Sequence, residues 1–232
     1  MAAPSPVSQE SKARLALRGA FRVGLMFGLC VWGGLSGWWQ LWPFLGLCVA
    51  VMTINLVVIK LRNPGLLRQR LKPDRPERGW DRLVLFGSIP AAVAVFVVAG
   101  LDVLRFHWSH VSALAMVAGG LLFLGGDAVI AWCMGENPFL ERTVRIQEER
   151  AHHVITTGPY RLVRHPMYLG FVIMTLGWAP VLGSYWAAIP ILLLDLLLVA
   201  RTHYEDRTLH RELPGYREYA EKTRYRLLPG VW

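Results

Sequence analysis

Residues 157–170 read TGPYRLVRHPMYLG, a turn-forming and cationic stretch that runs directly into a long apolar segment. Gly158 tolerates positive φ angles and the proline after it fixes φ near about −65°, so the pair predicts a break in the backbone. Pro166 suits the first turn of a new helix, where its missing N–H leaves no hydrogen bond unmade. Arg164 and His165 then precede a helix N-terminus, whose free N–H groups and dipole favour an anion. The stretch therefore predicts a site for a small anionic ligand at the mouth of a membrane helix.

The composition of the chain favours a membrane protein. Hydrophobic residues make up 54% of the 232 residues, charged residues make up only 18%, and the charges are segregated into blocks. This pattern indicates a polytopic membrane protein rather than a soluble domain, and the ten Trp and seven Tyr suit interfacial belts. The formal net charge of +9 resides in short basic blocks between apolar segments. It therefore indicates the anionic face of a lipid bilayer as the partner, and not nucleic acid.

Six apolar segments approach the roughly 20 residues that a helix needs to cross the hydrocarbon core. We predict an all-α, polytopic integral membrane protein with about six transmembrane helices, at residues 21–39, 44–59, 83–101, 111–134, 167–181 and 184–200. The last two form a membrane helix hairpin over residues 166–200. Because the segment 167–181 is short, this hairpin either crosses the bilayer or lies tilted without fully crossing it.

The distribution of Lys and Arg orients these segments. Four lie in an N-terminal arm (1–20 with Arg22), eight in a loop at 60–82, five in the connection 135–165 and seven in the tail. The connections on the other side contain only Arg105. The positive-inside rule therefore places both termini and both long loops in the cytoplasm. The chain divides into the arm at 1–20, four spans at 21–134 and a C-terminal part at 135–232.

Three blocks of sequence carry a resemblance to a known family. The first is GPY at 158–160 followed by VRHPMY at 163–168 and Gly170; the second is Arg201 with Glu205-Asp206 and LPGYREY at 213–219. A weaker block runs from RNPGLL at 62–67 to Trp80-Asp81. Together they resemble the isoprenylcysteine carboxyl methyltransferase family, which is related to the membrane phospholipid methyltransferases. Asp206 stands where that family usually has the second Glu of a pair.

The resemblance implies methyl transfer from S-adenosylmethionine inside the membrane, with residues 135–232 as the catalytic part. The absence of a Gly-rich strand–turn–helix fingerprint agrees with a cofactor site outside a soluble nucleotide-binding fold. Within this interpretation, cationic side chains suit the carboxylate of the cofactor, tyrosines suit adenine or the sulfonium, and Glu205 suits the ribose or the ammonium. The amphipathic cytoplasmic tail would complete the site. The predicted cofactor-binding residues are His153, Val154, Ile155, Gly158, Tyr160, Arg164, His165, Tyr168, Gly170 and Glu205.

The predicted substrate is a lipophilic, isoprenoid-like or lipid molecule that enters from the membrane. Arg201 would hold a substrate carboxylate, as its family position implies and as the bidentate fit of guanidinium to carboxylate allows. Gln147 is assigned to the substrate site as well. A carboxylate nucleophile needs no general base, whereas an amine would need deprotonation, for which Glu205 is the nearest candidate. Arg201 and Glu205 are therefore the predicted catalytic residues, and the acceptor stays open between a carboxylate, an amine and a thiol.

Two other classes of protein remain open. One is an NADPH-dependent membrane isoprenoid or sterol reductase, whose C-terminal helical layout is similar; the Arg-His-Pro block favours the methyltransferase over it. The other is a non-catalytic lipid-binding membrane protein. At the residue level, Tyr160 and Tyr168 are alternatively interfacial anchors, and Arg201 with Glu205 is alternatively a solvated pair one helical turn apart.

Several polar and small residues lie inside predicted spans. Asp127 and Asp195 are either functional or form structural hydrogen bonds between helices, because an isolated carboxylate in a bilayer is unfavourable. The glycines at 119–120 and 125–126 indicate close helix packing. No metal site is predicted, since neither CxxC nor a helical histidine pair is present. The oligomeric state does not follow from the sequence.

Overall fold

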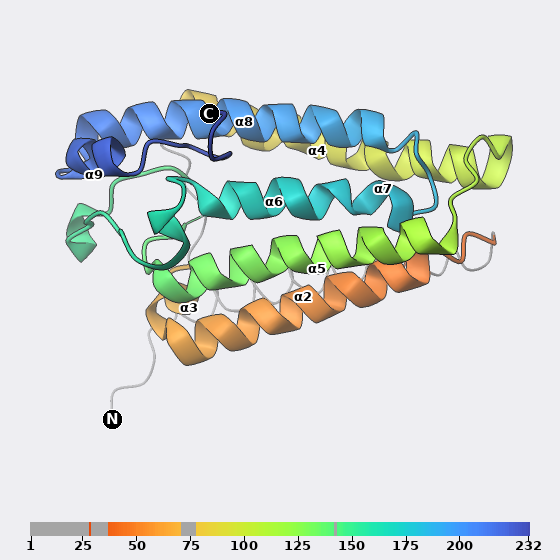
Figure 1. The fold of residues 1–232 in the computed structure, drawn as a ribbon, viewed down its shortest axis with the longest axis horizontal. Helices are drawn as coiled ribbons and strands as arrows, with labels where there is room; N and C mark the ends of the chain where they lie inside the picture. Colours follow the sequence, from red (N-terminus) through yellow and green to blue (C-terminus); the bar gives the residue numbers. More distant parts are fainter. Residues whose placement is uncertain (1–27, 29–36, 71–77, 142) are drawn as a thin grey trace, which may run out of the picture.

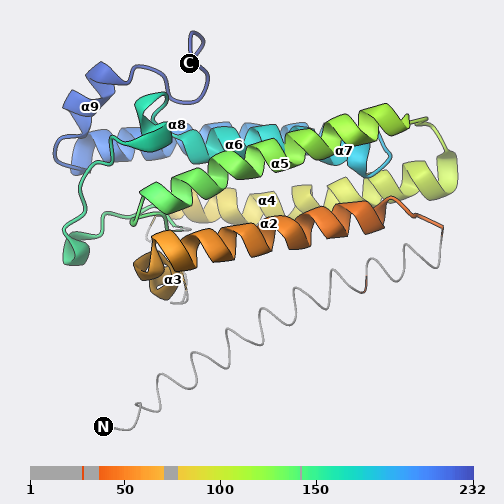
Figure 2. The ribbon, with the colours of Figure 1, turned by 60° about the horizontal axis from the view of Figure 1, so that its bottom comes forward.

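The computed structural model describes residues 28, 37–70, 78–141 and 143–232, and every regular element in these residues is helical. Figures 1 and 2 show an elongated bundle in which the long helices run side by side, α6 and α7 lie along them, and α3 and α9 lie at one end. The long helices are α2 (Leu41–Arg62), α4 (Gly79–Gly100), α5 (Ala113–Glu136) and α8 (Ala188–Glu212). The shorter helices are α3 (Pro64–Arg70), α6 (Pro166–Leu176), α7 (Trp178–Val181) and α9 (Tyr216–Lys222).

Three helices in the described part of the chain are long and apolar enough to cross a membrane: Leu41–Arg62, Gly79–Phe106 and Ala113–Glu136. They contain the predicted segments 44–59 and 83–101 and all but the first two residues of 111–134, so the helical prediction is confirmed for these three. The middle one continues from α4 through a π-helical turn at Leu101–Phe106. The predicted arm 1–20 and most of the predicted span 21–39 lie outside the described residues.

The predicted hairpin differs from expectation in how its second helix ends. The first arm consists of α6 and α7, which together make a shorter apolar helix, Pro166–Val181. The second arm, α8, does not end at residue 200 but continues for 12 more residues to Glu212. No Gly or Pro interrupts the chain between Pro190 and Pro214, and the helix stops where Gly215 takes φ +79°. The apolar half and the charged half of α8 are therefore one continuous rod.

Two glycine pairs bring α5 and α6 into backbone contact. A Cβ on Gly126 would lie 2.4 Å from the carbonyl oxygen of Gly170, and one on Gly177 would lie 2.2 Å from the carbonyl oxygen of Gly119. Each pair is seven residues from the other in both helices, so the antiparallel helices meet at two levels of one seam. Small residues are what permits such an approach, as predicted for the glycines of the fourth span.

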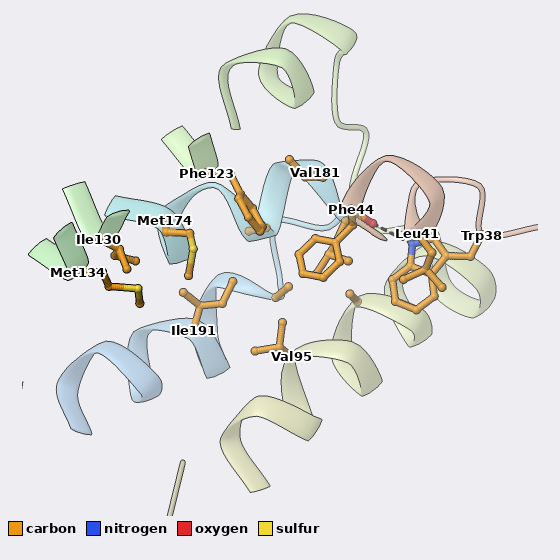
Figure 3. Close-up of a cluster of buried hydrophobic side chains, with 14 of the residues drawn as sticks. Trp38, Leu41, Phe44, Val95, Phe123, Ile130, Met134, Met174, Val181 and Ile191 are labelled. Atoms are coloured by element: carbon orange, nitrogen blue, oxygen red, sulfur yellow. Dashed lines mark hydrogen bonds between the residues drawn. The ribbon is translucent and has the colours of Figure 1, made fainter. Parts of the chain in front are cut away.

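An aromatic cluster holds the far end of the bundle. Phe44 of α2 makes edge contacts with Phe96, Phe123 and Trp178, with ring centroids 5.6–5.7 Å apart. Figure 3 shows Phe44 and Phe123 of this cluster beside other buried apolar side chains from several helices. Trp38 is buried beside them and donates a hydrogen bond from its indole N–H to the carbonyl oxygen of Leu182, 2.9 Å away. The packing fixes the hairpin turn against the start of α2.

Asp127 has a structural partner within the bundle. The amide of Asn55 on α2 donates to its carboxylate on α5 at 2.5 Å. This bond connects two helices that also pack together through apolar side chains. Of the two readings left open for Asp127, the structure supports the interhelical hydrogen bond, which suits a polar pair within membrane-spanning helices.

Replacing Gly126 with Ala should destabilise the protein, because the added methyl group would collide with the backbone of α6 and force the helices apart. Overpacking of this kind destabilises by about 1–3 kcal/mol. Gly125 is the matched control, since nothing lies within 4 Å of a Cβ there; Gly125→Ala should be neutral or stabilise by up to about 1 kcal/mol. Thermal unfolding of the two variants in detergent measures this difference, and equal melting temperatures would contradict the seam.

Candidate active site

A single buried carboxylate joins the segments that surround the site. Asp206 on α8 is fully buried. It accepts hydrogen bonds from Arg164 (Nε 2.8 Å, Nη2 3.2 Å) and from the Tyr216 hydroxyl at 2.9 Å. The Nε of Arg226 lies 2.8 Å from it and the Nε2 of His165 lies 3.2 Å from it. The loop before α6, helix α8, helix α9 and the C-terminal segment therefore converge on this one side chain.

The hydrogen bonds of this cluster determine the protonation states of its members. Burial alone would raise the pKa of Asp206, but the hydrogen bonds from His165 and Arg164 outweigh it and hold that pKa well below its usual range. Burial, together with the neighbouring Asp206 charge, raises the pKa of Tyr216, so that phenol keeps its proton and donates it. The cluster is thus an ionised carboxylate enclosed by donors.

The side chain of Arg164 is bound within the protein. Besides Asp206, its Nη1 donates to the carbonyl oxygens of Thr223 at 2.9 Å and Arg224 at 2.6 Å. Its backbone N–H donates to the carbonyl oxygen of Tyr225 at 2.9 Å. Every guanidinium nitrogen of Arg164 thus has a partner in the chain. These contacts anchor the C-terminal segment, while the predicted contact of this guanidinium with an anionic ligand stays a prediction.

A cavity of about 100 Å³, lined by a mixture of polar and apolar side chains and here called the polar cavity to distinguish it from a more apolar neighbour, adjoins this cluster. The connection 137–168, the polar half of α8 and the start of α9 enclose it, and the tail thus contributes Tyr216 and Tyr219 to the wall. Most of the predicted cofactor-binding residues meet there although they lie up to 52 positions apart in the chain. Those that line the cavity are His153, Val154, Ile155, Tyr160, Arg164, His165, Tyr168 and Glu205.

Three predicted site residues lie elsewhere. Gly170 packs against α5. Gly158 takes φ +55° in a turn against Glu136, where a Cβ would clash. Gln147 is buried and donates to the carbonyl oxygen of Phe139 at 2.7 Å, so it braces the loop. None of the three lines the cavity described above, and their predicted contacts with cofactor or substrate stay predictions.

The polar cavity offers backbone groups as well as side chains. In the described residues, the N–H and C=O groups of Val154 and Ile155 have no hydrogen-bond partner, and neither has the N–H of Met167 in the first turn of α6. Burial and the charges of His153 and Arg150 lower the pKa of His152 to about 4, so its ring is neutral above that pH. An extended edge and a helix N-terminus therefore face the same space.

Arg201 lies at the inner end of this cavity. Its Nη2 is 3.0 Å from the buried carboxylate of Asp81, and its guanidinium lies over the Tyr168 ring, 5.8 Å from the centroid. The Tyr168 hydroxyl donates to Glu205. Asp81 also accepts the backbone N–H of Val144 at 3.1 Å. Asp81 belongs to the weakest of the three sequence blocks that resemble the family, and no pattern in the sequence indicated that it would contact Arg201.

A second, apolar cavity of about 480 Å³ begins where the first one ends. Its walls come from α4, α6 and α8, with residues such as Val84, Phe171 and Leu198. Both cavities share part of their lining, namely Glu141, Met167, Tyr168 and Arg201. A polar ligand and an apolar ligand bound in the two cavities would therefore meet beside Tyr168 and Arg201.

Residues 119–211 match the model of the isoprenylcysteine carboxyl methyltransferase (ICMT) family, which confirms the resemblance over this region. A probable protein-S-isoprenylcysteine O-methyltransferase of Oryza sativa subsp. indica is 39% identical over 34% of this chain and 42% of its own length. The nickel-cobalt-cadmium resistance protein NccN of Alcaligenes xylosoxydans xylosoxydans is 25% identical over 61% of this chain and 62% of its own. The cobalt-zinc-cadmium resistance protein CzcN of Cupriavidus metallidurans is 29% identical over 56% of this chain and 58% of its own length. The chain thus spans less than two thirds of each of these relatives.

Replacing Asp206 with Asn should strongly destabilise the protein, because Arg164 and Arg226 would lose the charge that compensates them. Breaking a buried ion pair costs about 3–5 kcal/mol. Glu212→Gln is the matched control, since Glu212 pairs with Arg78 on the surface, where such pairs contribute about 0–1 kcal/mol. Thermal unfolding in detergent compares the two changes, and similar losses would refute the central role of Asp206.

The same variant should reveal a pH dependence. The pKa of Asp206 is lower in the folded chain than in the unfolded chain. Its stabilising effect is therefore complete above the unfolded value of about 3.9 and is lost as the pH falls below it. The difference in melting temperature between the wild type and Asp206→Asn should be constant from pH 5 to pH 7 and narrow below about pH 4. A difference that widens on acidification would contradict the assignment.

Proposed function

We propose that this chain, whose residues 119–211 carry the ICMT-family region, is a membrane-embedded S-adenosylmethionine-dependent methyltransferase that methylates the carboxylate of a lipophilic substrate. One observation carries the proposal: a polar cavity and an apolar cavity adjoin at Tyr168 and Arg201. Such a pair of sites suits a reaction between a polar methyl donor and an apolar acceptor. The protein-S-isoprenylcysteine O-methyltransferases among the relatives support the same class.

The residues around the polar cavity fit the proposed cofactor. The unpaired backbone groups of Val154 and Ile155 match the donor and acceptor edge of adenine. Glu205 is oriented by the Tyr168 hydroxyl and suits the ribose hydroxyls or the ammonium group. Tyr160 lines the same space and provides an aromatic wall. These groups would hold S-adenosylmethionine without a soluble nucleotide-binding fold. Because the cavity of about 100 Å³ is smaller than the roughly 300 Å³ of an ordinary small-molecule site, binding would have to widen it.

The anionic end of the cofactor needs a different partner from the one predicted. Since the Arg164 guanidinium is taken by Asp206 and the C-terminal segment, we assign this end to the N-terminus of α6. The free N–H of Met167 lies there, and the helix dipole favours an anion at the same place. Arg164 and His165 then act as positioning residues that hold the start of α6 in place.

The substrate would bind in the apolar cavity with its carboxylate at Arg201. A cavity of about 480 Å³ lies in the size range of small-molecule sites, and its lining is mainly hydrophobic. Arg201 remains charged, and its planar guanidinium matches a carboxylate. Asp81 and the Tyr168 ring hold it on the α4 and α6 sides. The substrate charge would therefore be fixed at the junction of the two cavities.

S-adenosylmethionine, when bound, supplies an electrophilic methyl group on a positively charged sulfur. Arg201 aligns the acceptor carboxylate, so that one of its oxygens faces the polar cavity while the other stays hydrogen-bonded. Met167 and Tyr168 line both cavities and would exclude water from the junction. No proton has to move for a carboxylate acceptor. For an amine or thiol acceptor, we assign the proton to Glu205, which the Tyr168 hydroxyl orients beside the junction.

We also propose that the chain has six spans with both termini in the cytoplasm. The basic connections that follow α2, α5 and α8 gather at the end of the bundle that carries the polar cavity (Figure 1). The cofactor would enter from this cytoplasmic end, and the lipophilic substrate would enter laterally from the bilayer. Cysteine accessibility labelling at the C-terminal Trp232 and near Arg105 in inverted vesicles tests this orientation; labelling of both from the same side would contradict it.

Calorimetry on the detergent-solubilised protein tests the proposed activity. S-adenosylhomocysteine should bind and NADPH should not. Transfer of a tritiated methyl group into a total lipid and protein extract should then follow, with heat-inactivated protein as the control. Binding of NADPH alone would favour a reductase, and binding of neither ligand would favour a non-catalytic lipid-binding protein; either result would refute the proposal.

Replacing Arg201 with Lys should weaken substrate use and spare cofactor binding. Lysine keeps the positive charge but loses the two-pronged hydrogen bonding to a carboxylate. Because a hydrogen bond to a charged group contributes about 1.5–3 kcal/mol, kcat/KM for a lipophilic acid should fall about 10- to 100-fold. Arg207→Lys on an exposed position of the same helix is the control. An equal loss of affinity for S-adenosylhomocysteine would argue against the assignment.

A further inference from the structure

Asp195 is a buried carboxyl group in the wall of the apolar cavity. It lies on α8, its exposed fraction is only 9%, and the cavity around it is lined mainly by Leu, Phe, Val and Met. One of its oxygens, Oδ1, accepts a hydrogen bond from the Thr175 hydroxyl of α6 at 2.8 Å. Within the described part of the chain, no donor reaches the other oxygen, Oδ2. A polar atom in such surroundings is unfavourable unless a partner completes it.

The one donor that Asp195 has is shared. A threonine hydroxyl carries a single hydrogen. The Thr175 oxygen lies 2.9 Å from the carbonyl oxygens of Phe171 and Val172, besides 2.8 Å from Asp195. Three acceptors thus compete for one proton, so Thr175 alone cannot satisfy Asp195. Asp195 and Thr175 therefore form a polar spot, with hydrogen-bonding capacity left unused, on an otherwise apolar surface.

Asp127 has a donor on one oxygen only, as Asp195 has, but it lies away from both cavities. It accepts a hydrogen bond from Asn55 across the α2–α5 contact, and it lines neither cavity. Asp195, in contrast, borders the cavity in which the substrate would bind. Ser88 of α4 lines the same cavity and donates to the carbonyl oxygen of Leu85 at 2.8 Å, which leaves its own oxygen able to accept. Polar atoms from α4, α6 and α8 therefore interrupt the apolar lining.

The polar spot lies at a defined depth. Asp195 precedes Arg201 by six residues on the continuous helix α8. At about 1.5 Å and about 100° per residue, their Cα atoms are about 9 Å apart along the helix axis and about 120° apart around it. A ligand held by its carboxylate at Arg201 would therefore reach Asp195 with a carbon well inside its chain, and not with one next to the carboxylate.

We propose that Asp195 and Thr175 bind a hydroxyl group well inside the chain of the lipophilic substrate, away from the carboxylate at Arg201. A hydroxyl suits the spot because it donates to an ionised Asp195 and equally accepts from a protonated one. An unbroken hydrocarbon chain would leave the carboxyl group unpartnered in an apolar wall. The preferred substrate is therefore a hydroxylated lipophilic acid. This inference rests on the proposed function for the site of Arg201.

A pair of matched acids tests the inference. Competition with tritiated octadecanoic acid, bound to the purified protein in detergent, gives the affinity of octadecanoic acid and of its 8-hydroxy derivative. The 8-hydroxy acid should bind at least about tenfold more tightly, because a site built for a hydroxyl rejects an analogue that lacks it. The 3-hydroxy derivative controls for polarity and should show no such gain. Equal affinities for the three acids would overturn the inference.

Variants at Asp195 separate recognition from folding. Asp195→Leu should abolish the preference and leave binding of octadecanoic acid unchanged or tighter, whereas Asp195→Asn keeps hydrogen-bonding atoms and should retain the preference. Melting temperatures verify that both variants fold; if Asp195→Leu unfolds, Thr175→Val provides the same comparison and should reduce the preference. A preference that survives Asp195→Leu, or loss of both affinities in equal measure, would overturn the inference.

The result of this binding test does not depend on whether the protein transfers methyl groups. The binding assay needs no cofactor and no turnover. A hydroxyl preference in a protein that binds no S-adenosylhomocysteine would leave the inference standing and refute methyl transfer. Methyl transfer to all three acids at equal kcat/KM would support the proposed function and overturn the inference of a hydroxyl site.

Discussion

The architecture of the site depends on the burial of one ionised carboxylate. Asp206 has no exposed surface and receives donors from the loop before α6, from α9 and from the C-terminal segment. A charge in such a position is stable only when it is fully paired. If these segments moved apart, Asp206 would keep its charge but lose its partners, so the pairing holds the segments together. The polar cavity exists because the cluster keeps the tail folded over the end of the bundle. Arg164, the most prominent cation of the sequence, thereby anchors the C-terminal segment.

Helix α8 relates the two cavities to each other. Its apolar half lines the larger cavity, its charged half lines the smaller one, and Arg201 lies where they meet. Because the helix is continuous, the positions of Asp195, Arg201 and Glu205 are fixed by helical rise alone. The glycine seam between α5 and α6 then fixes the other wall, which carries Tyr168 and Thr175. A rigid rod and a tightly packed pair of helices thus set the distance between any polar ligand and any apolar ligand bound here.

Hydropathy predicted the three long apolar helices well, because segments of that length and composition have few alternatives in a membrane. Local motifs also predicted most of the polar lining, including Val154, Tyr160 and Glu205. The sequence could not show which cations remain available, since the partners of Arg164 come from residues 206 and 223–226 and depend on tertiary folding. For the same reason it missed Asp81 as the partner of Arg201. The packing of Gly170 against α5 was missed because a glycine at a binding motif and a glycine at a helix seam look alike without the neighbouring helix. Similarly, a charged residue at 201 suggested the end of a span, whereas the helix continues because nothing in the backbone stops it.

An experimental structure of the protein with S-adenosylhomocysteine tests the central claim most directly. The adenine should lie against the backbone of Val154 and Ile155, the amino-acid end at the first turn of α6, and the sulfur toward the junction at Tyr168 and Arg201. Density for the ligand in any other part of the bundle, or a polar cavity closed by the protein's own side chains in the presence of saturating ligand, would contradict the account.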